Sequence, residues 1–192
     1  MARQTPLMRS LLPGAAALWL LLTAFGAAPE AWTIDRSAST IDLSVRALGG
    51  THEGRFEDWG GDILVDPAAP ERSRATVVVQ VRSLRMRPDS ATERALGPGF
   101  LDAARHPVIR FQLRALQPRG GGRFTARADL TARGVTRPVS FPLDLRTEGA
   151  RAHMTGGFAF DRADFGIGTS SVWNGLIERR VTVRVSLQAR RG

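Results

Sequence analysis

The chain has 192 residues and a formal net charge of +9, from 27 basic and 18 acidic residues. This length is enough for one domain with a substantial core. All of the basic residues are arginine, but they are dispersed, and no aromatic residues are interleaved with them as a base-stacking platform requires, so nucleic-acid binding is not expected. Because the chain has no cysteine, it holds no disulfide, and its stability must come from apolar burial and strand pairing.

Residues 1–28 have the order of a secretory signal. Arg3 and Arg9 come first, then the apolar run LLPGAAALWLLLTAF, then small residues. The uninterrupted apolar part, residues 15–25, is about half of the roughly 20 residues needed to span a bilayer. We therefore predict a cleaved signal peptide, with an uncleaved membrane anchor as the alternative. The domain then covers residues 29–192 and works in the periplasm or after secretion.

Beyond the leader, apolar and polar residues alternate at the strand period. The first strand is expected to bend near residues 36–39, and the second to bulge where Phe56 and Trp59 fall out of phase ahead of Gly60 and Gly61. About eight strands are expected, at residues 32–45, 54–65, 75–84, 108–116, 124–131, 137–145, 154–160 and 177–189.

The stretch 124–145 is typical of a β-hairpin with one apolar face. Gly134 lies in its connection and is free to adopt positive φ. Pro138 and Pro142 share one parity, and neither can donate a backbone hydrogen bond. Such residues are tolerated where a strand lacks a partner on that side. We therefore expect this strand to lie beside an opening or an irregular edge.

Residues 88–107 are the stretch without strand character. Ser90 is expected to cap a short helix that runs through Ala91 to Leu96, and residues 100–105 are expected to add another helical turn. This excursion, near residues 90–105, should cover one end of the sheet. About eight antiparallel strands with one apolar parity predict an all-β barrel or sandwich.

Four segments together resemble the YceI-like family. The hairpin ADLTARGVTRPVSF (residues 128–141) is similar to the family's hairpin motif. Three further segments match the family's sequence in the family's order. They are WTID (32–35) with STI (39–41), FLD (100–102) followed by HP (106–107) and IRF (109–111), and DFG (164–166). The resemblance covers residues 31–189 and implies an extended lipocalin-like antiparallel β-barrel, which encloses an apolar cavity for an isoprenoid chain or quinone.

Two positions depart from the family pattern. Ala47 stands where the family commonly has a histidine, and TERAL (residues 92–96) stands where it commonly has Arg-Asp-x-His-Leu. We therefore carry over no contact to a lipid headgroup.

No motif in the sequence indicates catalysis, a metal or a cofactor. Asp161 and Asp164 form an acidic loop pair, which we interpret as turn caps with an ion pair to Arg162. The three histidines are far apart and lack a second ligand at metal spacing: His52, His106 and His153.

The inward residues mix phenylalanine with alanine and glycine, a mixture that by itself leaves an interlocked core or a channel open. The resemblance favours a channel. The predicted function is non-catalytic carriage of an amphipathic isoprenoid lipid, either a polyisoprenoid or an isoprenoid quinone. Transient membrane contact and a homodimer stay open. The alternative is an exported stress or envelope interaction protein with a filled barrel, and an enzyme ranks third. The predicted cavity lining is Leu43, Val45, Phe56, Val79, Ile109, Phe111, Phe124, Phe141, Phe158 and Phe165, with Trp173 near a mouth.

Overall fold

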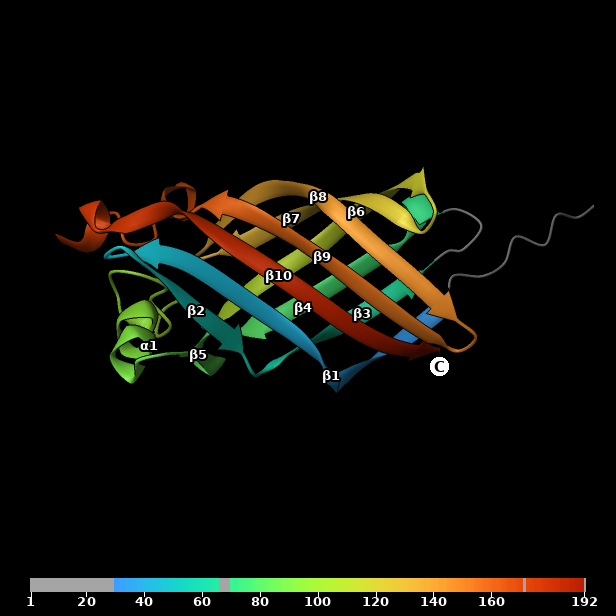
Figure 1. Cartoon of the computed structure of the whole chain (residues 1–192), viewed down its shortest axis with the longest axis horizontal. Helices are drawn as coiled ribbons and strands as arrows, with labels where there is room; N and C mark the ends of the chain where they lie inside the picture. Colours follow the sequence, from blue (N-terminus) through green and yellow to red (C-terminus); the bar gives the residue numbers. More distant parts are fainter. Residues whose placement is uncertain (1–29, 66–69, 171, 192) are drawn as a thin grey trace, which may run out of the picture.

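The computed structural model describes residues 30–65, 70–170 and 172–191. The expected signal, residues 1–28, lies outside the described residues. The described part is built mainly of antiparallel strands (Figure 1). The strands are β1 (Glu30–Ala47), β2 (Gly50–Phe56), β3 (Trp59–Val65), β4 (Arg74–Gln80), β5 (Leu84–Met86), β6 (Val108–Gly120), β7 (Arg123–Ala132), β8 (Val135–Glu148), β9 (Arg151–Asp161) and β10 (Ile177–Arg191).

These strands close into a barrel, as predicted. The neighbours run β10-β9-β8-β7-β6-β4-β3-β1, and β10 also pairs with β1 and closes the ring. One part of β1 pairs with β3 and another part with β2, so β2 and β3 act as one broken strand. β4 pairs with β3 and β5 pairs with β2, so β4 and β5 also act as one broken strand. The wall therefore has eight strands, and the sandwich alternative is wrong.

Local irregularities let the sheet curl. The register of β1 against β10 shifts between Asp35 and Thr40, where a bend was predicted. β2 and β3 are separated by two residues, so both Phe56 and Trp59 are buried, as the loss of alternation indicated. A Cβ atom on Gly61 would lie 1.9 Å from the Thr76 carbonyl oxygen. Glycine at this position is what allows β3 and β4 to pair this closely.

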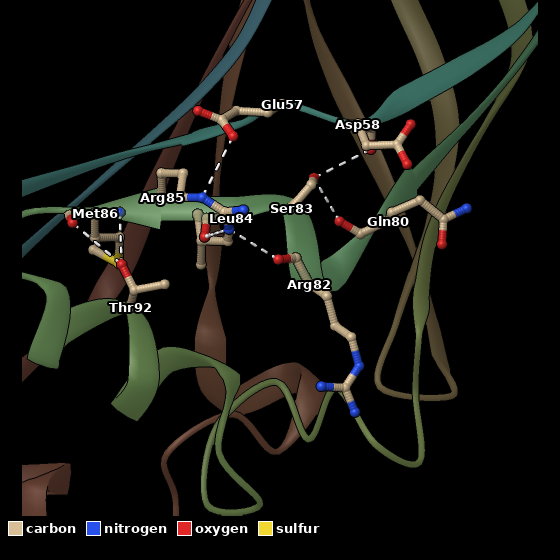
Figure 2. Close-up of polar contacts among 9 residues, drawn as sticks. All are labelled: Glu57, Asp58, Gln80, Arg82, Ser83, Leu84, Arg85, Met86 and Thr92. Atoms are coloured by element: carbon tan, nitrogen blue, oxygen red, sulfur yellow. Dashed lines mark hydrogen bonds and ion pairs between the residues drawn. The ribbon is translucent and has the colours of Figure 1, made fainter.

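The predicted strand at residues 75–84 is interrupted, which corrects the sequence analysis. The 3-10 turn η2 (Val81–Ser83) divides it into β4 and β5. The Ser83 hydroxyl lies 2.7 Å from the Gln80 carbonyl oxygen and 3.2 Å from the Asp58 carbonyl oxygen, and it holds the turn (Figure 2). After the turn, β5 pairs with β2 and, among the described strands, has no partner on its other side. A seam therefore opens between β5 and β6.

Helix α1 (Asp89–Leu96) begins beside this seam, in the predicted excursion. Ser90 lies inside the helix and does not cap it, because Pro88 occupies the N-cap position. Residues 100–105 form hydrogen-bonded turns in place of the expected helical turn. The Thr92 hydroxyl accepts from the Met86 N–H at 2.8 Å and lies 3.2 Å from the Met86 carbonyl oxygen (Figure 2). These contacts fasten α1 to β5.

A second seam separates β8 from β9, and it explains the two prolines. β9 pairs with β8 from Leu143 to Glu148, and residues 135–142 of β8 pair with β7 alone. Pro138 and Pro142 lie in this stretch, so the prediction of an irregular edge is confirmed. The 3-10 turn η3 (Arg162–Phe165) lies against β8 near the seam. Both seams are at the end of the barrel that carries α1, which we call the helix end; the opposite end is the far end (Figure 1).

Candidate functional site

The barrel encloses a cavity of about 320 Å³, lined by inward side chains of the wall strands. This volume is at the lower end of the roughly 300–1,000 Å³ typical of small-ligand sites. The cavity runs from Ala47 and Leu48 at the helix end to Thr147 and Ala152 at the far end. The alternating sequence therefore produces a lumen with unfilled space.

Aromatic rings form one wall of the cavity. The ring centroids of Phe111 and Phe141 are 6.1 Å apart, and those of Phe141 and Phe158 are 5.1 Å apart, both at tilted angles. On the neighbouring wall, Val185 of β10 lies directly opposite Gly156 of β9, and both line the cavity. The Phe141 ring packs over Gly156, with Cε2 3.2 Å from the position of a Cβ atom there, so glycine at this position makes room for the aromatic wall.

The polar side chains of the lining gather at its two ends. His52, Arg94 and Arg162 line the helix end, and Ser73, Arg74 and Thr147 line the far end. None of the described lining residues is acidic. A molecule with an apolar tail and an electronegative head therefore meets apolar walls along the middle, and no described negative side chain in the lining opposes its head.

Arg162 is the most deeply buried of these polar residues, with 1% of its surface exposed. Its Nη1 donates to the Ile167 carbonyl at 2.8 Å, and its Nε donates to the Glu178 carbonyl at 3.1 Å. Its Nη2 lies within 3.0 Å of the Asn174 carbonyl and side-chain oxygens and of the Ile177 carbonyl oxygen. Burial lowers the pKa of Arg162. The guanidinium therefore ties the β9–β10 connection together.

The prediction that Arg162 forms an ion pair with Asp161 or Asp164 is wrong. The Asp161 carboxylate instead pairs with Arg179 at 2.8 Å, and it accepts from the Ala163 N–H at 2.8 Å as the cap of η3. The hydrogen bond from Arg179 lowers the pKa of Asp161. The predicted capping role is confirmed for Asp161, with a different arginine as its partner, and stays a prediction for Asp164.

Most of the predicted lining residues lie on the cavity surface, although their contact with a ligand stays a prediction. They are Leu43, Val45, Phe56, Val79, Ile109, Phe111, Phe141 and Phe158. Phe124 packs instead against the cluster around Ala126 and Leu143, outside the lining. Phe165, the last residue of η3, is buried in a cluster with Leu130, and it also lies outside the lining. The Trp173 side chain lies outside the described residues.

The three histidines are separated in the fold as they are in the sequence. His52 lines the cavity, the His106 ring packs beside Gly134, and His153 Nε2 lies 3.2 Å from the Ser186 hydroxyl. Within the described residues, no group of three or more histidine, cysteine or acidic side chains lies close enough together to hold a metal ion. No helix in that same part of the chain is long and apolar enough to cross a membrane.

Comparison with known proteins decides the family. The model of the YceI-like domain matches residues 32–189, which is most of the chain. The chain belongs to the YceI-like family. Its YceI-like relatives include a UPF0312 protein of Pseudomonas savastanoi, 30% identical over 156 residues that cover 77% of this chain and 81% of the relative. A UPF0312 protein of Shewanella baltica is 28% identical over 77% of this chain and 82% of that protein.

Solved structures share the YceI-like fold. BcnA of Burkholderia cenocepacia superposes with a TM-score of 0.76 at 22% identity, over 81% of this chain and 98% of that one. A polyisoprenoid-binding domain of Saccharophagus degradans, implicated in plant cell wall breakdown, gives a TM-score of 0.68 at 16% identity, over 85% of this chain and 99% of that one. At these identities the likeness shows the fold alone.

Both departures from the YceI-like pattern lie at the helix end. Ala47 and Arg94 line the cavity there, and Thr92 fastens α1 to β5. Thr147 at the far end continues the inward parity of Leu143 and Leu145, but it lies beyond the predicted end of that strand at residue 145. Ser73 directly precedes β4, where no alternation indicates the direction of its side chain. The polar lining was therefore the part of the site that sequence reasoning missed.

Proposed function

We propose that this YceI-like protein binds an amphipathic isoprenoid lipid, a polyisoprenoid or an isoprenoid quinone, without covalent chemistry, and carries it in the barrel. The observation that supports this most directly is a cavity with apolar walls along its middle and polar side chains at its ends. The Saccharophagus degradans domain of the same fold, which binds polyisoprenoids, adds support.

The cavity volume sets the scale of the binding. At about 30 Å³ per small group, 320 Å³ accommodates on the order of ten carbon-sized groups. Ten buried methylenes contribute about 8 kcal/mol before the costs of ordering and association, so a Kd of about 1 μM is the tightest value that this burial alone supports. Apolar walls discriminate weakly between tails of different length, so the protein should bind different isoprenoid tails with similar affinity. A longer tail extends through one end of the barrel.

The proposed place of action is the periplasm or the extracellular space, on the strength of the leader pattern in residues 1–28. Transient contact with a membrane is the proposed route by which the lipid reaches the cavity. The proposal includes no catalytic step and no bound cofactor other than the lipid passenger. Homodimerisation stays a prediction, and sedimentation of the purified protein would measure it.

Identification of lipid in protein purified from its own host tests the proposal. Native mass spectrometry and solvent extraction should detect an isoprenoid on the wild type. Val185→Phe should lower occupancy at least tenfold, because Val185 lines the cavity and a larger ring there would take up part of its volume. Arg184→Gln is the matched control, since Arg184 is the exposed neighbour on the same strand. A correctly folded wild type that stays empty and takes up no isoprenoid, yet retains a protein partner, would favour the filled-barrel alternative.

A further inference from the structure

Two segments cover the seams at the helix end of the barrel. Cover A is residues 89–101, which contain α1 and lie beside the β5–β6 seam. Cover B is residues 162–168, which contain η3 and lie against β8 near the β8–β9 seam. Ala95 and Leu101 of cover A and Ile167 of cover B line the cavity. The covers, rather than paired strands, therefore close this end of the lumen.

The two covers touch each other directly. The Gly168 N–H of cover B donates to the Gly99 carbonyl of cover A at 2.8 Å. A Cβ atom on Gly168 would lie 2.8 Å from Phe100 Cε1, so the two segments are packed as closely as glycine permits. Neither cover can move far while the other keeps its position.

Arg133 joins both covers from the tip of the β7–β8 hairpin. Its Nη1 donates to the Gly166 carbonyl of cover B, and its Nη2 donates to the Pro98 carbonyl of cover A at 3.0 Å. The next residue, Gly134, packs against His106, whose Cε1 lies 3.3 Å from the position of a Cβ atom there. One side chain thus bridges two segments that are more than 30 residues away in the sequence.

The backbone at Arg133 makes this contact informative. Arg133 and Gly134 form a two-residue turn with φ of 52° and 75°, the left-handed region that favours glycine and asparagine. Arginine is unfavourable at the first turn position, because that position requires the left-handed φ. A residue in such a conformation points to a role for its side chain, and here the guanidinium contacts both covers.

We propose that Arg133 is a latch that keeps covers A and B closed over the helix end of the cavity, and that its release gives an amphipathic lipid access there. The identity of the passenger rests on the proposed function. The latch itself is a property of the protein without ligand. Its loss should raise the rates of entry and exit together, because Arg133 holds the covers and does not itself line the cavity.

The variant Arg133→Asn separates latching from folding, because asparagine suits the left-handed turn better than arginine does. The first measurement is amide hydrogen exchange at Gly168 in the ligand-free protein. We expect exchange at least tenfold faster in Arg133→Asn than in wild type, with an unchanged or higher midpoint of global unfolding. Arg137→Asn is the matched control, since Arg137 is exposed on the same hairpin and donates to the neighbouring Thr136 carbonyl. Equal exchange at Gly168 in wild type and Arg133→Asn would overturn the latch.

The second measurement follows stopped-flow uptake and release of N-phenyl-1-naphthylamine, an apolar fluorescent probe. Arg133→Asn should raise the association and dissociation rates by about the same factor, tenfold or more, and leave Kd within about twofold. Arg133→Lys has a single ammonium in place of the forked guanidinium, so its association and dissociation rates should lie between those of wild type and those of Arg133→Asn. A rise in the dissociation rate alone would mean that Arg133 contacts the ligand, and would overturn the latch. A wild type that binds no probe would count against the proposed function, while Gly168 exchange still decides the latch.

Discussion

Replacing Arg162 by methionine tests how the β9–β10 connection is held. Methionine keeps an unbranched apolar stem and removes all five hydrogen bonds that the guanidinium donates. The bond to the Ile167 carbonyl is buried, and leaving that acceptor without a partner costs about 1–3 kcal/mol. Water can partly replace the other four, which are half-buried, at a loss of about 0.5 kcal/mol each.

One term opposes this loss. The wild-type protein keeps a cation away from water, the same effect that lowers the pKa of Arg162, and the variant no longer bears this desolvation cost. We therefore expect a net loss of about 3 kcal/mol in the free energy of unfolding.

Urea denaturation followed by circular dichroism measures this loss. Arg179→Met is the matched control, because Arg179 forms an exposed ion pair with Asp161, a kind of interaction that contributes about 0–1 kcal/mol. If Arg162→Met and Arg179→Met lose equal stability, the network around Arg162 does not hold the connection, and the reasoning is wrong.

Two further predictions concern strand spacing and acid stability. Gly61→Ala should lose about 3 kcal/mol or more in urea denaturation, because its Cβ would lie 1.9 Å from the backbone oxygen of Thr76; Gly60→Ala, whose Cβ has no atom nearer than 4.0 Å, should be nearly neutral. The lowered pKa of Asp161 means that the ion pair with Arg179 stabilises the protein above about pH 4, and that this contribution is lost as the pH falls through the folded-state pKa. The urea midpoint of Asp161→Asn should therefore fall less than that of wild type between about pH 6 and pH 3, and equal falls would contradict the assignment.

The strands were the most predictable part of the molecule, because one covered face imposes strict alternation on each of them. Some irregularities were also visible in the sequence. The loss of alternation before Trp59 indicated an irregularity in the strand, and Pro138 and Pro142 indicated the seam beside β8. The η2 turn was not visible there. Val81 and Ser83 suit a strand, and the Ser83 hydroxyl lies near both the local Gln80 carbonyl oxygen and that of Asp58, which is 25 residues away in the sequence.

The site was predictable to the extent that it belongs to strands. Phe111 and Phe158 follow the alternation of their strands and line the cavity. Phe165 lies in the 3-10 turn η3, where strand alternation says nothing about direction, and it packs against Leu130. Arg94 comes from the helical excursion, where no strand period indicates that its side chain lines the lumen. The roles of such residues depend on contacts across the fold, which a local pattern does not contain.

Alternation also could not decide between a filled barrel and a hollow one, because both require the same apolar parity. The difference lies in the residues that face one another across neighbouring strands. Val185 lies opposite Gly156, and Ala75 lies opposite Leu113, so a small residue stands at each of these positions in the lining. At Gly156 the Phe141 ring takes the place of the missing side chain. An eight-stranded barrel is just wide enough to be filled by side chains, so whether space remains depends on which residue sizes the register brings together. Composition alone therefore could not predict the cavity, because it does not say which side chains the register places face to face.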